Sequence, residues 1–254
     1  TGLDVLVAED CARLRGHHVG LLVHPASVDA HLRHAAPLLQ AALGEELRAL
    51  FGPQHGLRGE TQDNMVEWQG FTDPVTGVPA YSLYGEVRKP TPAMLADLDT
   101  LVVDLQDVGA RYYTFTWTLL LCLEACAEAG VRVVVLDRPN PLGGEVLEGN
   151  LLDLEYRSFV GLACLPMRHG LTLGELALWL RDDQKLDLDL DVVAMEGWRR
   201  SMWFDDTGLP WVLPSPNMPT VDTAAVYPGF CLLEGTTLSE GRGTTRPFEL
   251  SGAP

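Results

Sequence analysis

The sequence has few basic residues, and this shortage argues against several classes of partner. Its 254 residues include 18 lysines and arginines against 35 aspartates and glutamates, so the formal net charge is −17. A surface of this sign repels phosphate backbones and anionic membranes, so we expect no nucleic-acid partner. An anionic ligand would also be repelled unless basic side chains gather at its site.

Cysteines and histidines are scattered without the spacing of a metal site. The five cysteines form no CxxC pair, which argues against a zinc ribbon and a disulfide framework. Cys122 and Cys126 lie in an apolar stretch and are predicted to be small buried hydrophobic side chains. His24, His31 and His34 are predicted to be solvated or bonded to nearby groups, and no metal is expected.

Nucleotide motifs and long apolar runs are missing as well. Neither GxGxxG nor GxxxxGK[ST] follows a predicted strand, which disfavours nucleotide binding, and we expect no cofactor. No GxSxG elbow occurs, so a serine hydrolase is weakly supported. Apolar runs such as residues 131–136 are far too short to span a bilayer, so no membrane insertion is expected. No signal peptide is recognised in the chain as given, and the cellular compartment and oligomeric state stay open.

Strands and helices alternate through most of the chain. Continuous apolar runs predict strands at residues 19–23, 47–51, 81–84, 100–105, 131–136 and 188–194. Helices are predicted at residues 35–43, 92–98, 117–129 and 171–181, the last with a capping box from Thr172 to Glu175. Strands that are apolar throughout are buried on both faces, so the sequence predicts an α/β fold. Its sheet is mostly parallel and has helices on both faces. Helical periodicity disappears from about residue 198, and we predict a subdomain change near residue 200.

Polar side chains follow three of the predicted strands. They are Gln54 and His55 after residues 47–51, Asp107 and Arg111 after residues 100–105, and Asp137, Arg138 and Asn140 after residues 131–136. Ligands bind outside the carboxyl ends of parallel strands, so these side chains are expected to meet in one crevice. The alternative is that the Asp–Arg pairs only tie loops together. His169 also lies in a polar loop before a glycine and is a second candidate site histidine.

Carboxylates are the chemically useful groups that remain in quantity. Glycosidic cleavage needs two of them, one held protonated and one ionised. The carboxylates available are Glu60, Glu67, Asp104, Asp107, Asp137, Glu234 and Glu240, and the composition does not single out a pair. In so acidic a chain, however, any single glutamate is as well explained as a solvated loop residue.

Several long blocks of sequence resemble one family. They are GPQHGLRG at 52–59, DLQDVGARYYT at 104–114, LDRPNPLGG at 136–144, PSPNMPT at 214–220, YPG at 227–229 and EGTTLSEGRGTTRPFE at 234–249. The chain resembles the DUF1343 family, which includes the NamZ-type exo-β-N-acetylmuramidases. The resemblance is collinear from about residue 3 to the end of the chain.

The resemblance implies a Rossmann-like domain over residues 1–200 and the start of a smaller second subdomain over residues 201–254. It implies release of N-acetylmuramic acid from the non-reducing end of peptidoglycan fragments, in a cleft between the two parts and without a cofactor. Many members have glutamate where this chain has Gln54, and an amide cannot donate a proton. Members also usually continue beyond the last block, so the second subdomain is expected to be incomplete.

On this hypothesis Glu60 is the candidate acid or base and Glu240 the second carboxylate, while His55 and Asp107 orient water or the leaving group. Side chains expected to bind the sugar are Gln54, Arg111, Tyr112, Asp137, Arg138, Asn140, His169, Asn217 and Arg242. The three arginines would bind the lactyl carboxylate, because a guanidinium pairs with carboxylate in a bidentate fork. The alternatives are a non-catalytic glycan-binding protein of the same fold and a hydrolase of another acidic sugar. Retention or inversion at the anomeric carbon stays open.

Overall fold

The computed structural model describes residues 1–61 and 66–253, and within them seven strands form one sheet in the order β3-β4-β2-β1-β5-β6-β9. Their bounds are β1 Val19–Val23, β2 Leu47–Gly52, β3 Phe71–Thr72, β4 Pro79–Ser82, β5 Thr100–Asp104, β6 Arg132–Leu136 and β9 Leu190–Val193. Only β3 pairs antiparallel, with β4, and every other pair in this sheet is parallel. Strands β7 (Glu148–Leu151) and β8 (Pro166–Arg168) form a separate antiparallel pair.

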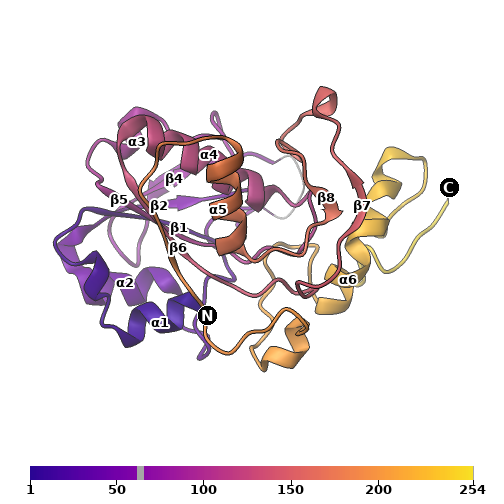
Figure 1. Ribbon diagram of the computed structural model, residues 1–254, viewed down its shortest axis with the longest axis horizontal. Helices are drawn as coiled ribbons and strands as arrows, with labels where there is room; N and C mark the ends of the chain where they lie inside the picture. The colour runs from indigo at the N-terminus through magenta and orange to yellow at the C-terminus, as the bar shows by residue number, and fades with distance from the viewer. Residues whose placement is uncertain (62–65, 254) are drawn as a thin grey trace.

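Helices cover both faces of the large sheet, as Figure 1 shows. They are α1 Gly2–Ala8, α2 Ala35–Leu43, α3 Pro92–Leu95, α4 Thr114–Ala129, α5 Leu173–Asp183 and α6 Val221–Phe230. Helices α1 and α2 pack into one apolar core, and α4 and α5 into a second core on the opposite face. Strand β6 divides its side chains between them, with Val133 and Val135 in one core and Val134 and Leu136 in the other. The predicted mostly parallel sheet with helices on both faces is confirmed.

Local signals in the sequence explain where the main helices begin and end. Thr172 and Glu175 form the predicted capping box at the start of α5. Helix α4 ends at Gly130, whose φ of +67° lies in the left-handed region that favours glycine. Cys122 and Cys126 are both fully buried within α4, as predicted.

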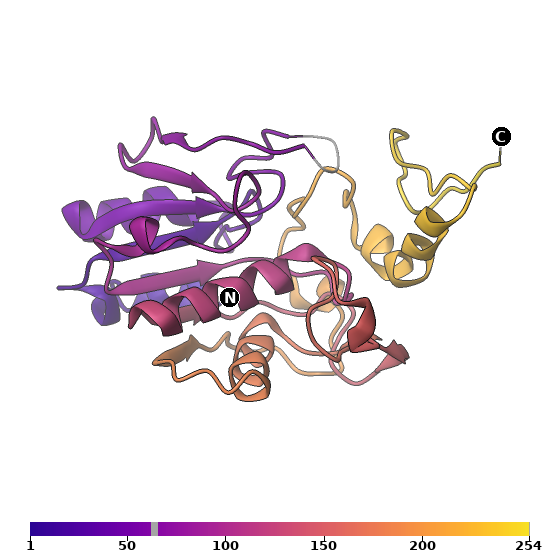
Figure 2. The ribbon, with the colours of Figure 1, turned by 90° about the horizontal axis from the view of Figure 1, so that it is seen from above.

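Helix α6 lies beyond residue 198, in the part of the chain where helical periodicity disappears and no helix was predicted. This helix contains Pro228, and its buried residues Thr223, Ala224 and Tyr227 include no long aliphatic side chain, so no apolar stripe marks it. Figure 2 shows α6 and the residues after it, in yellow, beyond the ends of the central strands.

The short elements α1, β3, β7 and β8 were also not predicted, and β4 lies two residues before its expected position. None of the described helices is long and apolar enough to cross a membrane.

Candidate functional site

A cavity of about 620 Å³ lies where the loops after β2 and β4 meet the start of α4 and the segment after α6. We call it the sugar-sized pocket, because its volume falls within the usual range for small-molecule sites. Its lining residues are Gln54, His55, Tyr84, Arg88, Tyr112, Tyr113, Thr114, Phe115, Ser158, Phe159, Val160, Ser215, Asn217, Met218, Tyr227, Cys231, Leu232, Glu234, Gly235, Arg242 and Phe248.

The loop after β2 supplies Gln54 and His55 to the pocket. The Gln54 side chain is nearly buried, and its Oε1 accepts a hydrogen bond of 2.9 Å from the Thr114 hydroxyl. His55 has a φ of +72°, which turns the chain sharply, and its Nδ1 lies 2.9 Å from the Thr61 carbonyl oxygen. Because that carbonyl only accepts, Nδ1 carries the imidazole hydrogen.

An aromatic wall lines one side of the pocket. The ring centroids of Tyr113 and Phe115 are 4.8 Å apart, and those of Tyr227 and Phe248 are also 4.8 Å apart, both pairs edge to face. Tyr113 and Tyr227 join the two pairs at 6.0 Å. Burial raises the pKa of Tyr112 to about 12, so its hydroxyl stays protonated and donates to the Pro228 carbonyl at 2.5 Å. Such a wall suits the apolar faces of a sugar ring.

The segment after α6 contributes a charged cluster. Arg242 forms ion pairs with Glu234 at 2.8 Å and with Glu240 at 3.5 Å, and its Cζ lies 4.9 Å from the Phe248 ring centroid. Glu234 and Arg242 line the pocket, whereas Glu240 is not among the lining residues. Among residues 1–61 and 66–253, Glu234 is the one carboxylate in the lining.

The loop after β4 contributes a second cation, Arg88. Its Cζ lies 3.9 Å from the Tyr84 ring centroid, close enough for a cation–π contact. Arg88 donates to the Gly85 carbonyl at 2.5 Å and to Glu67 at 3.1 Å. We did not single out this arginine from the sequence, although it follows a predicted strand as the other candidates do.

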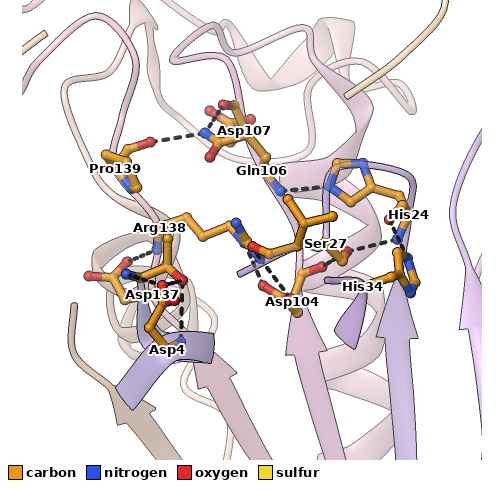
Figure 3. Close-up of polar contacts among 12 residues, drawn as sticks. Asp4, His24, Ser27, His34, Asp104, Gln106, Asp107, Asp137, Arg138 and Pro139 are labelled. Carbon is orange, nitrogen blue, oxygen red and sulfur yellow. Dashed lines mark hydrogen bonds and ion pairs between the residues drawn. The ribbon is translucent and has the colours of Figure 1, made fainter. Parts of the chain in front are cut away.

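Arg138 belongs to a buried polar network at the ends of β1, β5 and β6 (Figure 3). It donates to both oxygens of Asp104, at 2.5 and 2.8 Å, and to the Val28 carbonyl at 2.9 Å. His24 lies in the same network, where its Nε2 accepts from the Gln106 backbone N–H at 2.9 Å. The Arg138 guanidinium is therefore already bonded to Asp104, and Arg138 does not line the pocket.

The residues on either side of Arg138 also serve the fold. Asp137 accepts from the Gly174 backbone N–H at 2.8 Å and from the Thr172 hydroxyl at 3.2 Å, so it holds the start of α5. Burial raises the pKa of Asp137. Both polar atoms of the Asn140 amide are bonded. Its Oδ1 accepts from the Leu142 backbone N–H, and its Nδ2 donates to the Leu171 carbonyl.

A third group of candidates also lies outside the pocket lining. Asp107 sits 3.2 Å from the Nε2 of His169, and both side chains are almost fully buried. Arg111 donates through one nitrogen to the carbonyls of Asn150 and Leu165, each at 2.6 Å. Glu60 is exposed, and its carboxylate accepts from the Arg58 backbone N–H at 3.0 Å.

The pocket thus gathers some of the candidates and leaves the others apart. Gln54, His55, Tyr112, Asn217 and Arg242 line it. The candidates outside the lining are Glu60, Asp107, Arg111, Asp137, Arg138, Asn140, His169 and Glu240. No group of three or more potential metal-ligating side chains occurs among the residues that the structure describes.

Comparison with known proteins places this chain in a family. A sequence profile described as the N-terminal part of exo-β-N-acetylmuramidase NamZ matches residues 19–222, and the profile for the C-terminal part matches residues 225–254. The chain belongs to the NamZ family. The peptidoglycan β-N-acetylmuramidase NamZ of Bacillus subtilis is 51% identical over 254 residues, which are all of this chain and 61% of that protein.

Two solved structures share the fold over nearly the entire length of this chain. One DUF1343 family protein from Bacteroides fragilis is 43% identical with a TM-score of 0.90, over 99% of this chain and 64% of that one. A second protein from the same species is 34% identical with a TM-score of 0.84, over 100% of this chain and 66% of that one. The chain therefore spans slightly less than two thirds of the length of these relatives.

Proposed function

We propose that this protein binds peptidoglycan-derived saccharides in the sugar-sized pocket and releases N-acetylmuramic acid from their non-reducing ends. The observation behind the proposal is the 51% identity, over the entire chain, with a protein named as a peptidoglycan β-N-acetylmuramidase. The aromatic wall and the two lining arginines support it, because a muramic acid has apolar ring faces and one carboxylate.

The carboxylates near the pocket suggest a division of roles. Glu234 lines the pocket and forms an ion pair with Arg242 at 2.8 Å, and this position suits a base or a group that stabilises an oxocarbenium ion. Glu60, at the end of the loop that supplies Gln54 and His55, stays our candidate for the proton donor. We keep Glu240 as the alternative second carboxylate.

Hydrolysis of a chromogenic β-N-acetylmuramide by the purified protein tests the activity. Replacing Glu60, Glu234 and Glu240 one at a time by glutamine separates the roles. Loss of the acid or base is expected to lower kcat at least about 100-fold while sugar binding, measured by calorimetry, is kept. If all three variants turn over as fast as the unchanged protein, these carboxylates are removed from the mechanism.

A second candidate is a glycan-binding protein without activity. The observation that favours it is the amide of Gln54 in the pocket, beside a single lining carboxylate among the described residues. This alternative predicts muropeptide binding by calorimetry and no release of muramic acid. A hydrolase specific for another acidic sugar would instead act only on a non-muramic glycoside in a panel of chromogenic substrates.

A further inference from the structure

We propose that Arg88 is the residue that recognises the lactyl carboxylate of N-acetylmuramic acid, and so distinguishes this sugar from N-acetylglucosamine. The inference rests on the proposed function and names a specificity residue for it. The sequence suggested Arg111 and Arg138 for this role, but both are buried: one Arg111 nitrogen donates to two carbonyls, and Arg138 donates to both oxygens of Asp104. Neither lines the pocket, whereas Arg88 and Arg242 do.

The charges around the two lining arginines differ. Arg242 lies between two carboxylates, Glu234 and Glu240, so this cluster carries a net negative charge and repels an anion. Among the residues that the structure describes, Arg88 forms an ion pair with one carboxylate, Glu67, at 3.1 Å. The Glu67 side chain is 51% exposed, and an exposed pair of this kind contributes little free energy. A ligand carboxylate entering the pocket can therefore take over this bond from Glu67.

The Arg88 guanidinium is held in place before any ligand arrives. One face rests on the Tyr84 ring, its Cζ lies 5.8 Å from the Phe159 ring centroid, and one nitrogen is fixed on the Gly85 carbonyl. Tyr84 and Phe159 both line the pocket, with their ring centroids 5.9 Å apart. A cation oriented by two aromatic rings loses little conformational freedom when it binds a carboxylate.

Calorimetry with N-acetylmuramic acid and its methyl ester tests the contribution of the carboxylate, because the two sugars differ only at that group, which the ester leaves uncharged. We expect the unchanged protein to bind the acid about 10- to 100-fold more tightly than the ester. Arg88→Ala should bind both as weakly as the unchanged protein binds the ester. Arg88→Lys should keep part of the preference, and Glu67→Gln should bind the acid more tightly because the competing carboxylate is gone.

Arg15→Ala is the matched control, since Arg15 is an exposed arginine paired with Asp10 and lies outside the pocket lining. It should keep the full preference for the acid. If Arg88→Ala keeps the preference, or weakens the acid and the ester equally, the role of Arg88 is refuted while the proposed function stands. If the unchanged protein binds none of the muramic sugars, both proposals are refuted together.

Discussion

At the scale of single residues, Gln54 allows a test of whether the pocket gains from a proton donor at this position. It lies nearly buried in the pocket beside the Thr114 hydroxyl. A carboxyl group there would be desolvated, and burial favours its protonated form, as a general acid requires. We expect Gln54→Glu to raise the turnover of a chromogenic β-N-acetylmuramide at least about 10-fold, since general acids contribute 100-fold or more.

Gln54→Asn is the control for this substitution, because it alters the side chain without adding an acid. It should not raise the turnover. Equal rates for Gln54→Glu and the unchanged protein would show that the proton donor lies elsewhere in the pocket.

His24 makes stability depend on pH. Burial lowers the pKa of His24 to about 3, so its imidazole stays neutral in the folded protein, while the unfolded chain takes up a proton below about pH 6.5. The unfolded state then binds more protons, and the free energy of unfolding falls as the pH falls from about 6.5 towards 3. The slope from this histidine reaches about 1.4 kcal/mol per pH unit.

Urea denaturation at several pH values between 6.5 and 4.5 measures this slope. Burial also lowers the pKa of His34, so this histidine adds to the slope as well. The slopes of the variants are therefore compared with one another rather than with a slope of zero. His24→Asn should show the smaller slope, and His31→Asn, which alters an exposed histidine, should keep the original one. Equal slopes for the two variants would contradict the assignment.

At the scale of elements, two glycines with open surroundings test how backbone conformation sets stability. An added Cβ at Gly130 or Gly229 would meet no neighbouring atom within 4 Å. Gly130 has a φ of +67°, so Gly130→Ala should lower the free energy of unfolding by about 1 kcal/mol. Gly229 lies within α6, so Gly229→Ala should raise it by up to about 1 kcal/mol. Urea denaturation measures both, and changes of the same sign would refute this explanation.

Elements were predictable where burial is uniform. Strands β1, β5 and β6 are buried on both faces, so their apolar runs stand out in the sequence. Strand β7 is exposed throughout its length and leaves no such pattern. Helix α6 has small or polar buried residues and an internal proline, so periodicity does not reveal it.

The site was predictable only in part. The ends of the strands indicate the edge of the sheet at which a ligand binds, but not which side chains at that edge are already bonded within the protein. The rule that ligands bind at the carboxyl ends of parallel strands correctly placed Gln54 and His55 at the pocket. The same rule also selected Asp137 and Arg138, whose bonds hold α5 and the sheet edge. A sequence pattern cannot distinguish a carboxylate or guanidinium satisfied within the fold from one left for a ligand. The division of the chain after residue 200 stays a prediction.

At the scale of the whole molecule, the net charge of −17 should slow the arrival of an anionic sugar. Charges act over a Debye length of about 30 Å at 10 mM salt and about 8 Å at 150 mM salt, and salt screens them at longer distances. At low salt the ligand therefore meets the field of the entire protein, and at higher salt mainly the charges near the pocket, where Arg88 and Arg242 partly offset Glu67, Glu234 and Glu240.

We accordingly expect the association rate constant of an anionic muropeptide, measured by stopped flow, to rise roughly twofold or more between 10 and 150 mM salt. This is the reverse of the usual trend for a site that attracts its ligand electrostatically. The same ligand with its carboxyl groups esterified and its amino groups acetylated carries no charge and should show no change, because it feels neither field. If the rate constant of the anionic ligand falls with added salt, the local arginines dominate even at long range. The overall charge would then be no barrier to an acidic substrate.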